Sequence, residues 1–61
     1  MMTDTTIRVG RTVYNIVVYA LEHGYRAEAA RGGRVIEVVD APRKSEAWRG
    51  IRVKLEKRNG R

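Results

Sequence analysis

The sequence predicts a small α+β domain in which one helix packs on a three-stranded antiparallel sheet, in the order α-β-β-β. Three observations support this prediction. Apolar residues recur with helical spacing between Thr12 and His23, two glycines at positions 32–33 separate two strand-like runs, and apolar and charged residues alternate from Ile51 to Glu56. A chain of 61 residues has room for a single domain only, so we assign residues 1–61 to one domain.

The N-terminal segment is polar from Met1 to Thr6, and we expect this end to be mobile. The next three residues, Ile7–Val9, alternate between apolar and charged side chains, which is compatible with a short extra edge strand before Gly10.

A helix is predicted over Thr12–His23, with Thr12 as its N-cap and Gly24 at its C′ position. The run is rich in β-branched residues, whose propensity favours a strand. We give more weight to the regular spacing and to the length of the segment. The predicted apolar face, with the spacing i, i+3, i+4, i+7, i+8, consists of Val13, Ile16, Val17, Ala20 and Leu21.

Two strands of a hairpin follow, Tyr25–Arg31 and Arg34–Ala41. Gly32 and Gly33 form the turn between them, since glycine adopts the positive φ angles of a two-residue hairpin turn. Pro42 ends the second strand.

The C-terminal third is predicted to contain a polar connection, Pro42–Gly50, and a third strand, Ile51–Glu56. Residues 57–61 form a basic tail that we expect to fray.

Alternation along the strands predicts which side chains face the helix. These are Ile51, Val53 and Leu55, with Ile36 and Val38, and with Tyr25, Ala27 and Ala29. The opposite, open face is then formed by Arg26, Glu28, Ala30, Val35, Glu37, Val39, Arg52, Lys54 and Glu56.

The charge balance is strongly basic. Thirteen Lys and Arg residues, ten of them Arg, face seven acidic residues, which gives a net charge of +6 and a pI of about 10.5. Such a surface attracts polyanions, and the guanidinium group binds phosphate with two parallel hydrogen bonds. We therefore expect contacts to DNA or RNA through Arg26, Arg31, Arg34, Arg43, Lys44, Trp48, Arg49, Arg52 and Lys54.

Two features of this surface have a second interpretation. Glu28, Glu37 and Glu56 could pair with the arginines of the open face, which would then be an ordinary solvated surface. Trp48, the single tryptophan, either closes one end of the core, stacks on a base, or anchors a protein partner.

The sequence lacks the residues that several other classes of function require. No cysteine is present, and His23 is the single histidine, so we expect no metal site, no cofactor and no catalytic residue, and we predict that the protein is not an enzyme. No apolar stretch is long enough to cross a bilayer, and no secretory signal is recognisable, which favours the cytoplasm, or the nucleoid if DNA is bound. The scarcity of Asn, Gln and Cys is typical of thermophile proteins.

Our leading hypothesis is a non-enzymatic nucleic-acid-binding protein of low sequence specificity, either chromatin-like or accessory. In size, charge and lack of cysteine the chain resembles the small basic chromatin proteins of thermophilic archaea. The alternative is a small interaction module or inhibitor, of viral or plasmid type, that binds a host protein through Trp48, Tyr19 and arginines. Tyr19 on the polar side of the predicted helix also leaves a homodimer open. A third hypothesis is a toxin-type RNase of the double-stranded-RNA-binding-like class, whose sheet histidine and terminal helix have no counterpart in this sequence.

Overall fold

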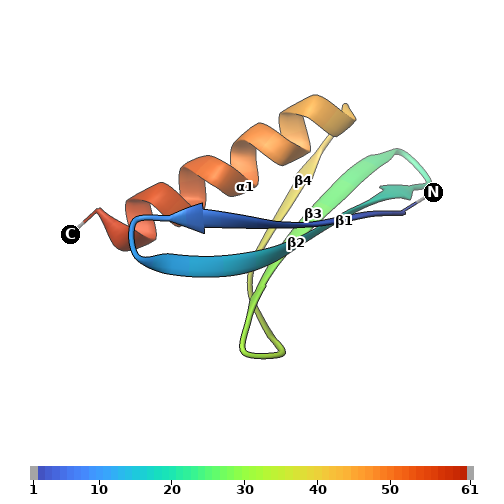
Figure 1. Ribbon diagram of the computed structural model, residues 1–61. Helices are drawn as coiled ribbons and strands as arrows, with labels where there is room; N and C mark the ends of the chain where they lie inside the picture. The colour runs from blue at the N-terminus through green and yellow to red at the C-terminus, as the bar shows by residue number, and fades with distance from the viewer. Residues whose placement is uncertain (1, 61) are drawn as a thin grey trace.

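The computed structural model describes residues 2–60, which form four strands and one helix. The strands make one antiparallel sheet in the order β1-β2-β3-β4, and the helix lies across one face of it (Figure 1). The α+β class is confirmed, but the order of elements is β-β-β-β-α and the sheet has four strands. The elements are β1 Met2–Val9, β2 Thr12–Leu21, β3 Gly24–Arg31, β4 Arg34–Ala41 and α1 Lys44–Asn59.

The predicted helix over Thr12–His23 is wrong, because this segment is strand β2. Its buried residues alternate, since Tyr14, Ile16 and Val18 face α1 while the residues between them face the other side. Apolar residues occupy so many positions of this segment that their spacing fits both the helical period of 3.6 residues and the strand period of two. The β-branched composition, which favours a strand, was the decisive signal.

The predicted connection 42–50 and the predicted strand Ile51–Glu56 are also wrong, because Lys44–Asn59 is one continuous helix. Ala47, Ile51 and Leu55 are buried at intervals of four residues, whereas Val53 is 43% exposed. The apparent alternation of Ile51 and Leu55 is therefore one side of a helix with an exposed valine between them. Glu46 in the first turn and basic residues in the last turn complement the helix dipole.

The hairpin from β3 to β4 is confirmed. Gly32 and Gly33 both have positive φ, 59° and 81°, and Arg31 pairs with Arg34 across them. These angles are those of a type I′ turn, whose twist matches that of the flanking strands. Pro42 follows the last residue of β4.

The core lies between α1 and the sheet. Small side chains on β3 let the helix approach closely, as predicted for Ala27 and Ala29. Tyr25 and Ile36 pack against the core, also as predicted. The fully buried residues are Tyr14, Ile16, Val18, Ala27, Ala29, Ala47, Ile51 and Leu55.

Alternation in β4 is interrupted, and this corrects the predicted faces. The register between β3 and β4 shifts at Ala29/Ala30, so an extra residue in β4 changes which side chains face inward. Val38, predicted to be in the core, is 41% exposed, whereas Val39 packs against the core. Glu37 is on the helix side, where it pairs with α1.

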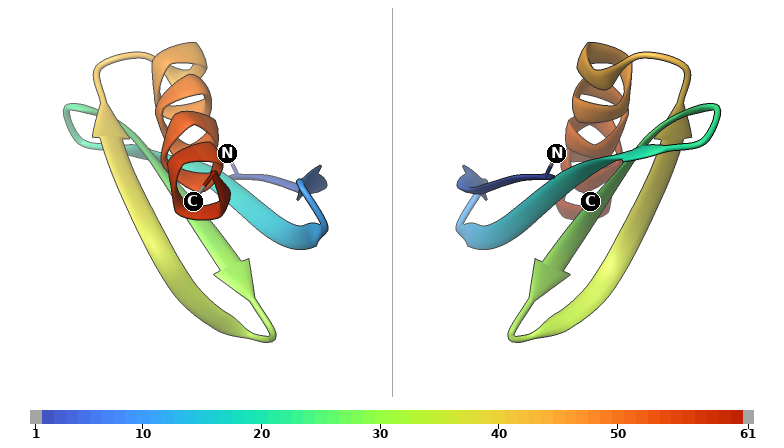
Figure 2. Two further views of the ribbon diagram at one scale, coloured as in Figure 1. Left: turned by 90° about the vertical axis from the view of Figure 1, so that its left-hand side faces the viewer. Right: turned by 90° about the vertical axis from the view of Figure 1, so that its right-hand side faces the viewer.

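We expected both ends of the chain to be mobile, but the structure places most of their residues in regular secondary structure. Residues 2–6 belong to β1, which pairs with β2 from Met2↔Tyr19 to Val9↔Thr12, and residues 57–59 belong to α1. Met1 and Arg61 are outside the described residues. The sheet is strongly twisted, and the two hairpins diverge from each other beneath the helix (Figure 2).

Candidate nucleic-acid interface

The tip of the β3–β4 hairpin places two arginines side by side. Arg31 and Arg34 are directly opposite each other in the register and flank Gly32-Gly33. Nothing lies within 4 Å of a Cβ added to either glycine, so the tip projects into solvent. Like charges directly opposite each other destabilise an antiparallel pair, by roughly 0.2–1 kcal/mol. The tip therefore concentrates positive charge at a cost to the stability of the hairpin.

Further basic side chains lie at the same end of the sheet. In an antiparallel meander the β1–β2 turn, which contains Arg11, is at the same end as the β3–β4 turn. The C-terminus of α1 also reaches this end, because a Cβ on Gly10 would lie 3.9 Å from Cβ of Asn59. The left panel of Figure 2 looks onto the C-terminus of α1 and the β1–β2 turn, and the β3–β4 hairpin projects downward from the sheet in this view. We call this end of the sheet the basic end and define it as Arg11, Arg31, Arg34, Lys57 and Arg58.

Carboxylates neutralise only part of the basic end. Arg58 donates to Oε2 of Glu37 at 2.8 Å, and Nζ of Lys54 is 3.8 Å from Oε1 of the same carboxylate. Within residues 2–60 no carboxylate forms an ion pair with Arg11, Arg31, Arg34 or Lys57. Lys57 and Arg58 also stabilise the C-terminus of the helix through its dipole, whereas the two tip arginines have no such structural role.

Arg26, one of the predicted contact residues, is engaged in an ion pair. Its Nε and Nη2 atoms donate to Oδ1 and Oδ2 of Asp40 at 2.7 and 3.0 Å, on the face of the sheet away from α1. These hydrogen bonds lower the pKa of the Asp40 carboxyl. Beside this pair the Tyr19 hydroxyl donates to Oε2 of Glu28 at 2.6 Å, which raises the pKa of Tyr19.

In the second interpretation of the sequence, acidic side chains neutralise the arginines of the open face. The structure shows such pairing for part of this face, but between other residues than those expected. Arg26 pairs with Asp40, and Glu28 accepts a hydrogen bond from Tyr19. Arg52, Lys54 and Glu56, which we placed on this face, are on α1 instead.

The remaining predicted contact residues are distributed along α1. Arg43 and Lys44 are at its N-terminus, at the end of the molecule opposite the basic end. Arg49 is exposed, and Nε of Arg52 lies 3.7 Å from Oε2 of Glu56. Lys54 reaches β4, where Nζ is 3.4 Å from the carbonyl oxygen of Val38. The predicted set is therefore spread over the hairpin tip, the open face of the sheet and the length of α1, and only Arg31 and Arg34 belong to the basic end.

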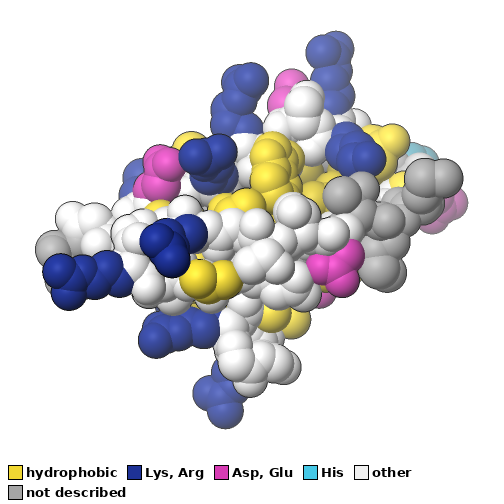
Figure 3. All heavy atoms as spheres, in the orientation of Figure 1, with side chains coloured by type: hydrophobic (Ala, Val, Ile, Leu, Met, Phe, Trp, Pro, Cys, Tyr) yellow, Lys and Arg dark blue, Asp and Glu magenta, His cyan; other side chains and the backbone are white. Residues whose placement is uncertain are grey.

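Basic side chains also project along the helix on the face seen in Figure 3, interspersed with acidic ones. The basic end includes Arg11, Lys57 and Arg58, which the prediction missed. The spacing of Ala47, Ile51 and Leu55 by four residues was the signal that could have found two of them. It marks a helix whose C-terminal residues Lys57 and Arg58 lie beside the β1–β2 turn, as the 3.9 Å between a Cβ on Gly10 and Cβ of Asn59 shows.

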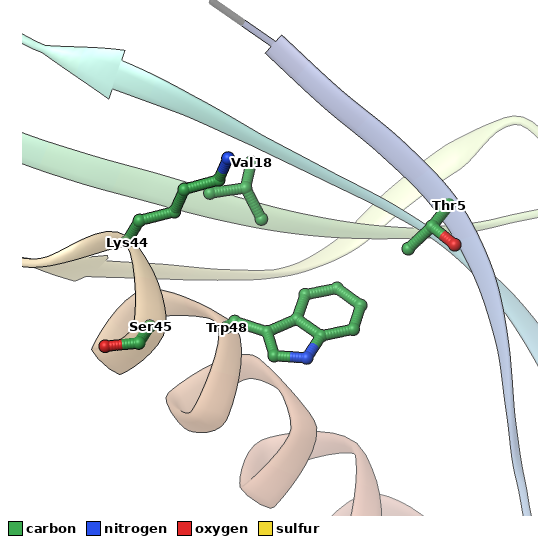
Figure 4. Close-up of a pocket in the computed structure, with 5 residues that line it drawn as sticks. All are labelled: Thr5, Val18, Lys44, Ser45 and Trp48. Atoms are coloured by element: carbon green, nitrogen blue, oxygen red, sulfur yellow. The ribbon is translucent and has the colours of Figure 1, made fainter.

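Trp48 lies on α1 rather than in a loop. It is half-buried, packs against the core, and lines an open groove of about 690 Å³ beside β1. In Figure 4 the indole ring occupies the space between the helix and the sheet, below Val18 and facing Thr5. This arrangement matches the interpretation in which Trp48 closes one side of the core. Lys44 and Ser45 line the same groove.

Comparison with protein-family models, with curated proteins and with solved structures gives no match to this chain. Among residues 2–60, no group of three or more His, Cys, Asp or Glu side chains is arranged to hold a metal ion. His23 is exposed in the turn between β2 and β3. The one helix of the described chain is too short and too polar to span a membrane.

Proposed function

We propose that the protein binds nucleic acid through the basic end, with low sequence specificity and without catalysing a reaction. The observation that carries this proposal is the direct pairing of Arg31 with Arg34 at a solvent-exposed tip where no carboxylate of the described residues is paired with either side chain. A bound phosphate removes the repulsion between the two guanidinium groups and uses their capacity for paired hydrogen bonds.

The binding mechanism is neutralisation of backbone phosphates. Each Lys or Arg that contacts a phosphate releases condensed counterions, which makes the affinity strongly dependent on salt. The hairpin below the helix in Figure 1 is a two-stranded ribbon, a shape that the major groove of B-form DNA admits. Arg and Lys contacts to the phosphate backbone carry no sequence information, which is why we expect low specificity.

Two charge-matched double variants test the proposal. Arg31→Gln with Arg34→Gln removes two charges from the basic end, and Arg43→Gln with Lys44→Gln removes two from the opposite end. Fluorescence anisotropy of labelled oligonucleotides, double- and single-stranded and of unrelated sequence, measures the affinity. We expect the first variant to weaken binding roughly tenfold or more for every sequence and the second to change it little. Equal losses in both variants would contradict an interface at the basic end.

Binding to a host protein is the second candidate function, and the groove beside Trp48 favours it. Aromatic residues in such grooves are frequent anchors of protein interfaces. On this hypothesis the wild-type protein does not bind free DNA or RNA, even at low salt. Trp48→Ala is then expected to abolish binding of the partner protein.

A further inference from the structure

Strand β1 is an edge strand that lacks several of the devices that usually block pairing, and its two charged side chains, Asp4 and Arg8, are of opposite sign. All eight of its residues are in register with β2, with no bulge, and the strand contains neither Pro nor Lys. Natural proteins normally block such an edge with one of these devices. The other edge, β4, has a register shift beside it, and Nζ of Lys54 lies against the carbonyl oxygen of Val38. The sheet is therefore open to extension at β1.

The turn that follows β1 determines which of its backbone groups are free. Val9 and Thr12 are paired across the two-residue turn at Gly10, so they exchange backbone hydrogen bonds. Every second residue then faces β2, and the residues between them direct their N–H and C=O groups away from the sheet. The outward-facing residues are Asp4, Thr6 and Arg8.

These outward-facing residues are complementary to themselves. When two β1 strands meet antiparallel with Thr6 opposite Thr6, Asp4 of each copy lies opposite Arg8 of the other. Both side chains are exposed and on the same face of the sheet. Arg8 makes no ion pair with any described residue, so it is available to a second copy. All the free backbone groups from Asp4 to Arg8 find partners in this register.

We propose that the protein forms a two-fold homodimer in which β1 pairs antiparallel with β1 of a second copy, to give one continuous eight-stranded sheet. The two Asp4–Arg8 pairs fix the register, and both helices lie on the same face. Isologous contacts of this kind are the commonest form of homodimer.

The same register accounts for the groove beside Trp48. Thr5 lines this groove and lies opposite Ile7 of the second copy, on the helix side of the sheet. Ile7 of the second copy is thereby placed at the open side of the groove, where an apolar side chain covers part of the indole ring (Figure 4). Dimerisation would remove apolar surface from water at the β1 edge of the sheet.

A charge exchange tests the dimer without nucleic acid and so independently of the proposed function. Asp4→Arg places like charges opposite Arg8, and Arg8→Asp places like charges opposite Asp4. We expect sedimentation equilibrium to give twice the chain mass of 7.0 kDa for the wild type. Each single variant should dissociate roughly tenfold more readily or worse, because two repulsive pairs replace two attractive ones. An equimolar mixture of the two variants should form a heterodimer, since both pairs are then restored.

Two controls keep this test independent of folding and of net charge. Arg11→Asp makes the same change of charge in the adjacent turn and should leave the dimer intact. Thr6→Pro removes an outward N–H, which the pairing with β2 does not use, and should yield folded monomers by circular dichroism. A wild-type chain that remains monomeric up to roughly millimolar concentration overturns the proposal. Dimerisation of either charge variant with wild-type affinity overturns it as well.

Discussion

Gly50 lies directly over Val39, because a Cβ added to Gly50 would be 2.8 Å from Cγ1 of Val39. Glycine in the middle of a helix costs roughly 1 kcal/mol relative to alanine. Here the missing side chain lets α1 approach β4 closely, so the cost of the glycine is offset by packing. The contact also explains why a residue that seemed to belong to a loop is found within a helix.

Gly50→Ala should therefore destabilise the wild-type protein, by about 1–2 kcal/mol, even though alanine is the better helix former. In a Val39→Ala background the clash disappears, and the same substitution should become neutral or stabilising. Urea denaturation of the four proteins of this cycle measures the coupling. Stabilisation by Gly50→Ala in the wild type would contradict the close approach.

Tyr14 connects β2 to the end of the helix. Its buried hydroxyl accepts a hydrogen bond of 2.8 Å from Nδ2 of Asn59. Tyr14→Phe should cost about 0.5–1.5 kcal/mol and lower Tm by several degrees. Tyr25→Phe is the matched control, because no hydrogen bond of the Tyr25 hydroxyl to a described side chain is present. Equal effects of the two substitutions would show that the Asn59 contact does not stabilise the fold.

The ion pair of Arg26 with Asp40 predicts a dependence of stability on pH. Because Arg26 lowers the pKa of Asp40 in the folded state, the pair stabilises the fold above the unfolded pKa of about 4. This contribution is lost as the pH falls through the lower, folded pKa.

The difference in Tm between the wild type and Asp40→Asn should thus be small but constant above about pH 5 and shrink in more acidic solution. Glu22→Gln, which removes a carboxylate from the exposed β2–β3 turn, serves as the control for a change of net charge alone. A difference for Asp40→Asn that grows on acidification would have the wrong sign for this ion pair.

Strand β2 can be tested by two neighbouring valines. Val18 is 2% exposed beneath α1, whereas Val17 is half-exposed on the open face. Val18→Thr should cost about 1–3 kcal/mol, because a hydroxyl is buried among apolar groups, and Val17→Thr should cost less than about 0.5 kcal/mol. If this segment were a helix with Val17 on its apolar face, Val17→Thr would cost more stability than Val18→Thr, and that result would contradict the strand.

The elements that could be predicted from the sequence are those with local signals. Gly32-Gly33 requires a hairpin turn, and the flanking strands follow from it. The sequence predicts a helix over Thr12–His23 and a strand over Ile51–Glu56, the opposite of the types observed, because the apolar residues of both segments fit both periods over short stretches. Tertiary packing decides between the periods: β2 lies between two other strands, and α1 is the segment left to cover the sheet.

The candidate interface was predicted only in part, for the same reason. Arg31 and Arg34 depend on a local turn and were found. Arg11, Lys57 and Arg58 lie near one another because the β1–β2 turn and the end of α1 meet, as the proximity of Gly10 to Asn59 shows, and the β3–β4 turn is at the same end of the strands. A contact between residues so far apart in the chain produces no local pattern in the sequence, so it could not be predicted.

The central claim is that the basic end binds nucleic-acid phosphates, and the salt dependence of binding tests it most directly. The affinity for a short DNA duplex is measured at several salt concentrations, for the wild type and for Arg31→Gln with Arg34→Gln. We predict a steep fall of log K with log salt for the wild type, and a slope shallower by about 2 for the variant. Identical slopes, or no binding at low salt, would contradict the claim.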